Sequence, residues 1–181
     1  MTENQKEKWV IDQLHSEIDF KIRHLMITNV KGNFGEYDAS IYTTGTDFST
    51  AEIDCWINVA SINTGNADRD THLRGADFFD VAQFPQISFI ADSYEKVDGD
   101  GSFELWGVLT MKGIAKKIKL GVEFGGVVKD PWGNEKAGFA INGKINRKDW
   151  GLNYNSTLEA GGVLLGEDIT ISCEIQLKRG E

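Results

Sequence analysis

The sequence contains few of the residues that build disulfide frameworks and metal sites. It has two cysteines and three histidines among 181 residues. Cys55 and Cys173 lie far apart and show no C-x-x-C spacing, so neither a disulfide framework nor a zinc ribbon is expected. The three histidines also lack the short spacing of metal ligands. We therefore predict free buried thiols, no metal site and no cofactor.

Long apolar runs and an excess of basic residues are also missing. No stretch reaches the length that spans a bilayer, and the opening residues MTENQKEKW contain no apolar segment of a secretory signal. Stable membrane insertion is therefore not expected, and a cytoplasmic location is predicted. The net charge of −9, from 28 acidic and 19 basic residues, argues against nucleic acid as a partner because like charges repel.

What the sequence does contain is a repeated strand pattern, with two prolines and twenty glycines. Apolar residues recur mainly at every second position, which is the period of a β-strand. In the run EIDFKIRH at 17–24, one face carries four residues that are expected to be buried: Ile18, Phe20, Ile22 and His24. The other face of this run is charged. The same alternation recurs in three later runs: 51–61, 86–93 and 168–178.

These runs predict an all-β domain. Turn-forming residues at 98–101, 112–113 and 130–134 favour hairpins, and about eight strands are expected. A sheet of that size removes its edges by closing or by doubling into a sandwich, and we favour a closed antiparallel barrel. Two segments break the alternation and are expected to form one or two short capping helices or loops: 63–84 and 146–162. The barrel domain is predicted over 9–181, after an N-terminal tail at 1–8.

The sequence leaves open whether such a barrel is hollow. Most residues expected to face inward are Ile, Val, Leu and Phe, and a barrel of about eight strands can be filled by them or can hold one small apolar ligand. Small residues at six inward positions favour some free room: Ala51, Ala91, Gly107, Gly121, Ala137 and Gly143. A packed core and a ligand cavity are both possible interpretations of this pattern.

The segment RDTHLRGADFFD at 69–80 combines charged residues with two phenylalanines between strand-like runs. In one interpretation, Arg69, Asp70 and His72 orient the polar end of a ligand while the phenylalanines line a cavity. In the other, Arg69 and Asp70 hold a short helix in place and the phenylalanines close the core. Both interpretations place the segment at one end of the barrel.

His24 continues the buried face of its strand, and a buried imidazole needs hydrogen-bond partners. Such a histidine is more often a satisfied core residue than a ligand or a base. Arg69, Asp70 or His72 would supply the partner if their loop folds over the mouth of the barrel. That arrangement would place a polar end on an apolar cavity.

Two further residues have alternative interpretations. Cys55 lies in mid-strand among isoleucines, where burial raises a thiol pKa, so nucleophilic catalysis is not expected. In the segment NRKDWGLN at 146–153, Arg147 and Asp149 would reach the mouth. Trp150 either packs on a ligand or anchors the loop.

Several motifs resemble the YceI-like family of polyisoprenoid-binding or lipid-binding domains. They include SINTGNADRDTHLRGADFFDVAQFPQISF at 61–89, together with HSEIDFKIRH, VKGNFGEYDASI, LWGVLTMKGIAKKIKL and INRKDWGLN. The resemblance extends from about Trp9 to Leu177. It implies a lipocalin-like extended antiparallel barrel whose pore holds a long isoprenoid tail, such as that of a polyprenyl quinone or phenol, or another lipid amphiphile. Many relatives carry a secretory signal, which is not evident here.

The pattern and the resemblance together predict two groups of ligand-binding residues. The pore group is Phe20, Ile22, Phe34, Ile53, Cys55, Ile57, Phe78, Phe79, Phe84, Phe89, Leu109, Ile141, Trp150 and Ile171. The group at the polar mouth is His24, Arg69, Asp70, His72 and Arg147. No catalytic residue is predicted.

The main hypothesis is a non-enzymatic protein that binds, stores or transports a long-chain isoprenoid or lipid. One alternative is an enzyme that acts on an isoprenoid with His24 or His72 as acid or base. Another is a stress or interaction protein whose barrel is packed with side chains. A homodimer is possible, with the outward residues Trp56 and Trp106 as candidate contacts.

Overall fold

The computed structural model describes residues 5–97, 101–156, 158 and 164–180, and strands dominate this part of the chain. The strands are β1 (Lys6–Ile11), β2 (Glu17–His24), β3 (Thr28–Phe34), β4 (Tyr37–Thr44), β5 (Asp47–Asn58), β6 (Ile62–Asn63), β7 (Gln86–Lys96), β8 (Ser102–Met111), β9 (Ile114–Lys129), β10 (Glu135–Asn146) and β11 (Leu165–Arg179). The helices are α1 (Ala67–Arg74) and three short 3-10 helices: η1 (Gln13–His15), η2 (Val59–Ser61) and η3 (Arg147–Trp150).

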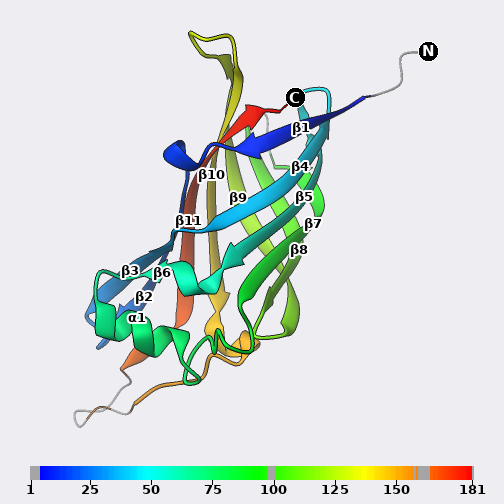
Figure 1. Cartoon of the computed structure of the whole chain (residues 1–181). Coiled ribbons are helices and arrows are strands. Elements are labelled where there is room, and N and C mark those ends of the chain that lie inside the picture. The colour runs from blue at the N-terminus through cyan, green and yellow to red at the C-terminus, as the bar shows by residue number, and fades with distance from the viewer. Residues whose placement is uncertain (1–4, 98–100, 157, 159–163, 181) are drawn as a thin grey trace.

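Eight strands form a closed antiparallel barrel, as the alternating pattern predicts (Figure 1). Their order around the barrel is β1, β4, β5, β7, β8, β9, β10 and β11, and the ring closes where β1 pairs with β11. In that pairing Trp9 lies opposite Arg179. Because β1 begins at Lys6, residues 6–8 belong to the barrel rather than to the predicted N-terminal tail.

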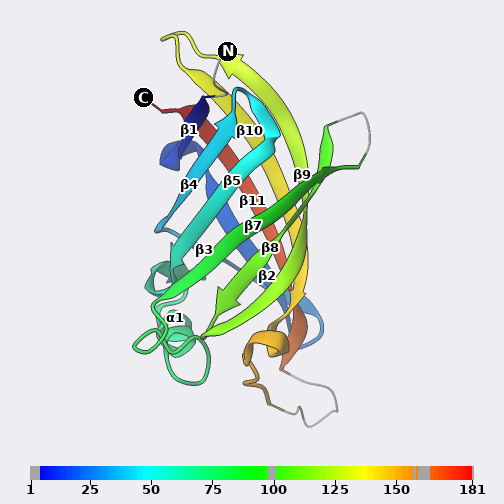
Figure 2. The same cartoon turned by 90° about the vertical axis from the view of Figure 1, so that its right-hand side faces the viewer.

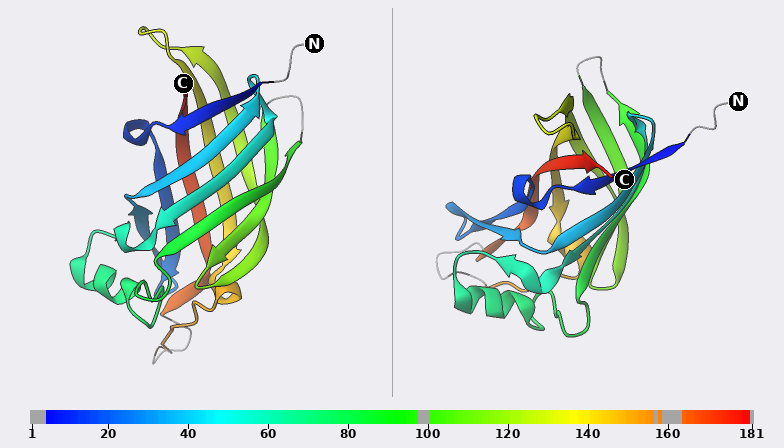
Figure 3. Two further views of the ribbon diagram at one scale, coloured as in Figure 1. Left: turned by 45° about the vertical axis from the view of Figure 1, so that its right-hand side comes forward. Right: turned by 45° about the horizontal axis from the view of Figure 1, so that its top comes forward.

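The other strands extend the barrel on one side. β1 and β2 both lie against β11: β1 pairs with its last residues from Leu177, and β2 pairs with the stretch that ends at Glu174. The 3-10 helix η1 makes the corner between β1 and β2. From β2 the sheet continues to β3 and the short β6, which Figure 1 labels beside the lower part of the barrel; Figure 3 shows the barrel from two further sides.

The two ends of the barrel differ. At one end, here called the helix end, α1, the segment 75–85 and η3 lie over the strands (Figures 1 and 2). The other end, here called the terminal end, carries β1 and the last residues of β11. The segments expected to cap the barrel, 63–84 and 146–162, thus lie where they were predicted wherever the structure describes them; residues 157 and 159–163 lie outside the described part.

Apolar side chains form three clusters along the barrel. The cluster at the helix end is centred on Phe34, Phe78, Leu109 and Trp150. The cluster at the terminal end contains Trp9, Ile41, Phe48 and Leu177. A smaller cluster of Leu105, Leu120 and Val122 lies between them. The alternation of the strands therefore buries apolar residues over the whole length of the barrel, as the sequence predicts.

Asp12 joins the corner between β1 and β2 to two other strands. Its carboxylate caps η1 by accepting from the backbone nitrogen of Leu14, 3.2 Å away, and it accepts from Lys136 Nζ at 2.7 Å and from Gln176 Nε2 at 3.4 Å. The side chain of Asp12 is 14% exposed. The hydrogen bond from Lys136, supported by His15, lowers the Asp12 pKa to about 2.

We expect Asp12→Asn to lower the stability of the fold at neutral pH by about 1 to 2 kcal/mol, because the charge-assisted hydrogen bond from Lys136 is lost while the asparagine can still cap η1. The ionised carboxylate stabilises the folded state above its unfolded pKa, and this contribution disappears as the pH falls from about 4 towards 2. Urea unfolding at several pH values measures the effect. The stability difference between wild type and variant should shrink over that window, while the exposed control Asp54→Asn should show no such change. A difference that stays constant down to pH 2 contradicts the assignment.

Candidate functional site

A cavity of about 440 Å³ lies inside the barrel. Its wall is overwhelmingly apolar, and it reaches from Ile41, Phe48 and Leu177 of the terminal-end cluster to Phe78 and Leu109 of the helix-end cluster. Its volume falls within the range of about 300 to 1,000 Å³ that is common for small-molecule sites. The interior is therefore hollow, which decides against the packed-barrel interpretation.

Most of the predicted pore residues line this cavity. They are Phe20, Ile22, Phe34, Ile53, Cys55, Ile57, Phe78, Phe79, Phe89, Leu109, Ile141 and Ile171. Phe78 and Phe79 also pack in the helix-end cluster, so they close the core and form the cavity wall at once. The two interpretations of these phenylalanines are both correct.

Trp150 and Phe84 do not line the cavity, contrary to the prediction. Trp150 is buried, and its indole Nε1 donates a hydrogen bond to the carbonyl oxygen of Leu109 at 2.9 Å. It therefore anchors η3 to β8. Phe84 lies instead against the β8–β9 turn, where a Cβ atom added to Gly113 would lie 3.2 Å from its ring.

The small inward residues contribute less free room than expected. Ala51 lines the cavity, whereas the space beside Gly107 is filled: a Cβ atom added there would lie 2.5 Å from Cζ of Phe89. The space beside Gly143 is taken by Leu120 in the same way. These two glycines allow a neighbouring large side chain to lie close to the sheet.

The cavity also has lining residues that were not predicted as site residues. Strand alternation identifies several of them, including Ile18 and Phe139. Four polar ones were not predicted: Asp19, Thr64, Tyr94 and Tyr154. Asp19, expected on the wet face of β2, is half-buried and lines the cavity, and burial raises its pKa. Tyr94 stacks on Phe103 at 4.6 Å between ring centroids, and its hydroxyl has no hydrogen-bond partner among the described residues.

At the helix end, Arg69 and Asp70 both bind Thr64. Asp70 accepts from the Thr64 nitrogen at 3.0 Å and from its hydroxyl at 2.5 Å, while Arg69 donates from Nε to that hydroxyl at 2.7 Å and from Nη2 to the Thr64 carbonyl at 2.6 Å. Asn66 caps α1 by accepting from the Arg69 nitrogen. These bonds hold the helix in place, as one interpretation predicts. Asp70 is buried and does not line the cavity, so its predicted place at the polar mouth is wrong.

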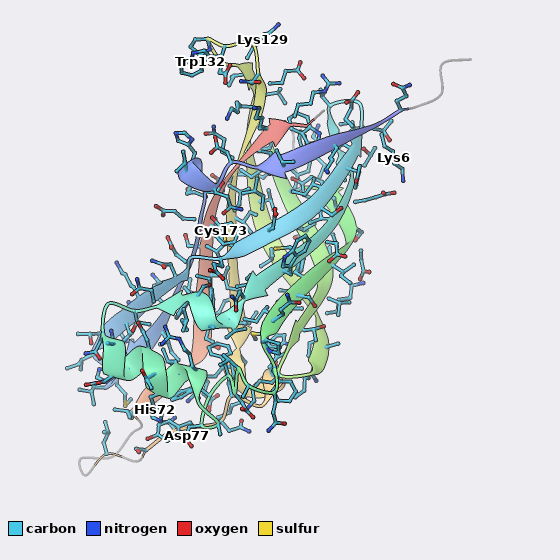
Figure 4. All side chains as sticks on the ribbon, viewed as in Figure 1. Lys6, His72, Asp77, Lys129, Trp132 and Cys173 are labelled. Atoms are coloured by element: carbon cyan, nitrogen blue, oxygen red, sulfur yellow. The ribbon has the colours of Figure 1, made fainter. Side chains whose placement is uncertain are left out.

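His72 brings a polar ring to the same end of the cavity (Figure 4). Its Nε2 lies 2.8 Å from a carboxylate oxygen of Asp77. The imidazole packs edge-on against Phe78 and Tyr154, with ring centroids 5.0 and 4.9 Å away. The Asp77 contact therefore orients a half-exposed imidazole among aromatic side chains that also line the cavity.

Arg147 lies deeper than the other charged residues of the site. It is 2% exposed and lines the cavity. Its Nε donates to the carbonyl of Gly166 at 2.8 Å, and its Nη1 donates to the carbonyls of Leu152 and Tyr154 at 2.7 and 2.8 Å. These bonds connect η3 to the following loop and to β11. Asp149, which was expected to reach the mouth, is exposed and does not line the cavity.

His24 lines the cavity but does not bond to the predicted partners. Within the described part of the chain its ring has no hydrogen-bond partner. Arg69 and Asp70 bind Thr64 instead, and His72 binds Asp77. His24 stands at the end of β2, so its half-buried ring is close to the polar end of the cavity. It is a polar wall residue and not part of a buried hydrogen-bond network.

The two cysteines face the middle of the cavity. Cys55 and Cys173 both line it, and burial raises the pKa of each thiol to about 12. Figure 4 shows Cys173 within the body of the barrel. A thiol with such a pKa carries almost no thiolate at neutral pH, so these residues act as small apolar wall groups.

Two further findings concern metals and membranes. In residues 5–97, 101–156, 158 and 164–180, no three His, Cys, Asp or Glu side chains come together as a metal centre would require. The same part of the chain holds no helix with the length and apolar character to cross a bilayer.

The geometry defines a class: a closed, lipocalin-like antiparallel barrel with an apolar internal cavity and a polar group of residues at one end. The sequence matches the YceI-like domain over residues 9–177. A UPF0312 protein of Staphylococcus aureus is 39% identical over 176 residues, which cover 96% of this chain and 98% of the relative. The chain belongs to the YceI-like family.

Solved structures agree with this assignment. A Campylobacter jejuni YceI protein is 38% identical and superposes with a TM-score of 0.76 over 88% of this chain and 90% of the other. A polyisoprenoid binding domain from Saccharophagus degradans has a TM-score of 0.69 at 15% identity, covering 95% and 98% of the two chains, and shows the fold alone.

Proposed function

We propose that this protein is a non-enzymatic carrier that binds one long-chain isoprenoid or other lipid amphiphile inside the barrel. The observation that carries the proposal is the apolar cavity of about 440 Å³, which runs between the two end clusters. The tail lies along the barrel and the polar end of the ligand lies near Arg69, His72 and Arg147. Polyprenyl quinones and phenols are candidate ligands of this type.

The fold and the site chemistry support binding over catalysis. The barrel architecture is shared with a domain described as polyisoprenoid binding, and this chain belongs to the YceI-like family. The raised pKa of both thiols disfavours a cysteine nucleophile. Storage, protection or delivery of the lipid would follow from enclosing it. A cytoplasmic location and a homodimer through Trp56 or Trp106 stay predictions.

The proposal is tested by blocking the cavity. Ile53 lines it and packs against both the terminal-end and the middle cluster, so Ile53→Trp should obstruct the path of a tail. We expect at least a tenfold loss of affinity for a neutral naphthylamine fluorophore, since a few methylene contacts account for that much. Lipid that co-purifies with wild type, detected by mass spectrometry of an organic extract, should also be lost.

The matched control is Asp54→Trp, which adds the same side chain at the next residue, on the exposed face of β5. It should bind the fluorophore like wild type. A circular dichroism melt shows that each variant is folded. Equal binding by both folded variants, or a wild type that neither carries nor accepts any lipid, argues against the carrier.

A further inference from the structure

The charges of the cavity wall are opposite to those of the chain as a whole. The chain has a net charge of −9, yet the wall contains two guanidinium groups, Arg69 and Arg147, and one carboxyl group, Asp19. Burial raises the pKa of Asp19, which disfavours its ionised form. The wall itself thus carries more guanidinium than carboxyl groups, and the carboxylates of Asp70 and Asp77 at the same end bind Thr64 and His72.

One guanidinium is hydrogen-bonded only in part. The three hydrogens on Nε and Nη1 of Arg147 are directed to the carbonyls of Gly166, Leu152 and Tyr154. Its Nη2 is buried and has no hydrogen-bond partner in the described part of the chain. Three of the five N–H donors of this side chain thus bind loop and strand carbonyls. The two N–H donors on Nη2 bind nothing in the described part of the chain.

Arg147 also lacks an anionic partner among the described residues. The acidic residue that acts on it electrostatically, Glu167, is paired instead with Lys148 at 2.8 Å. Carbonyl oxygens satisfy N–H groups, but they carry no net charge. A buried guanidinium stays protonated, and its burial is unfavourable unless a negative charge compensates it.

Arg69 supplies a second cation towards the same end. Two of its nitrogens donate to Thr64, which also lines the cavity, and this fixes the guanidinium against the wall. Its Nη1 makes no hydrogen bond to the described residues. Arg69 is more exposed than Arg147, so it lies nearer to solvent. Both arginines thus have N–H donors without a partner among the described residues. Those of Arg147 are buried, and those of Arg69 lie nearer to solvent.

We propose that the cavity selects lipids whose polar end is an anionic oxygen group, a carboxylate or a phosphate, with one oxygen accepting from Nη2 of Arg147. This inference rests on the proposed carrier function and narrows its ligand class. A neutral quinone or phenol oxygen would satisfy the free N–H groups but would leave the buried positive charge uncompensated. An anionic oxygen does both.

The test compares ligands that share one tail and differ in charge at the polar end. Hexadecanoate is compared with hexadecanol, and geranylgeranyl phosphate with geranylgeraniol, by displacement of the neutral fluorophore at low salt and at pH 8. We expect wild type to prefer the anionic member of each pair by about 10- to 100-fold, the usual value of a hydrogen bond to a charged group. A preference in only one pair identifies whether carboxylate or phosphate is the ligand group.

Two variants assign this preference to Arg147. Arg147→Gln should reduce the preference sharply, because affinity for the anionic ligands should fall much more than affinity for the alcohols. Lys148→Gln removes the same charge from the neighbouring exposed residue and should leave the preference unchanged. If Arg147→Gln does not fold, Arg69→Gln, which should reduce the preference in part, takes its place.

The two proposals fail in different ways. Wild type that binds alcohols as tightly as their anionic counterparts, or a folded Arg147→Gln variant that keeps the preference, overturns the anionic site while the carrier stands. Wild type that binds neither member of either pair overturns the carrier itself.

Discussion

Trp9→Ala is expected to lower the free energy of unfolding by about 3 to 5 kcal/mol, a large share of the stability of an ordinary domain. Trp9 is fully buried on β1, its ring lies 4.9 Å from that of Phe48, and its Nε1 donates to the Thr43 hydroxyl at 2.8 Å. It stands at the point where β1 pairs with both β4 and β11. Truncation removes apolar packing at the closing pair of strands. Urea unfolding followed by circular dichroism measures the loss.

The control for Trp9 is Trp132, in the turn between β9 and β10, whose side chain is 83% exposed. Trp132→Ala should change stability by less than about 0.5 kcal/mol, because little is buried there. Similar losses in the two variants would mean that the terminal-end cluster does not hold the barrel closed.

Affinity is expected to rise steeply with the length of the bound tail. Each methylene buried in an apolar cavity contributes about 0.8 kcal/mol, so four additional carbons should strengthen binding by about 200-fold. The rise should stop when the tail fills the space between the two end clusters. Saturated primary alcohols of increasing length, titrated against the fluorophore below their critical micelle concentrations, measure this slope. Alcohols are used because their uncharged polar end keeps the slope separate from the effect of Arg147.

If the cavity is blocked half-way, a shorter tail should already fill the space that remains. In Ile53→Trp, the length at which affinity stops rising should therefore decrease, whereas in Asp54→Trp it should match wild type. Affinity that does not depend on tail length in wild type would place the ligand on the surface of the barrel, against the proposed function.

The sequence predicts the barrel and most of its wall because strand alternation is a local property. In β2, the inward residues Phe20 and Ile22 follow directly from the period of two, and the turn at 112–113 has the positive φ angles that its Lys-Gly pair permits. Asp19 departs from this pattern: it is half-buried and lines the cavity, as do its neighbours Ile18 and Phe20.

The partners of the polar residues could not be predicted in this way. Asp70 and Arg69 were expected near His24, but both bind Thr64, a residue that no sequence pattern singled out. Hydrogen bonds of side chains depend on the path of a loop, which has no periodicity. Burial of Arg147 against three carbonyls likewise depends on where η3 ends.

The space beside glycines was misjudged for a related reason. A glycine in a strand leaves room only if no neighbour takes it, and the ring of Phe89 takes the room beside Gly107. The indole of Trp150 was equally ambiguous, because an aromatic residue in a loop has the same appearance in sequence whether it contacts a ligand or the backbone of Leu109.

The pairing of the first strand with the last, Trp9 opposite Arg179, has a consequence during synthesis. β1 is synthesised before β11, so a nascent chain presents the unpaired N–H and C=O groups of one edge of β1 until β11 has left the ribosome. Two nascent chains on one messenger would therefore be able to exchange their first strands. Slow synthesis of β11 would prolong that interval.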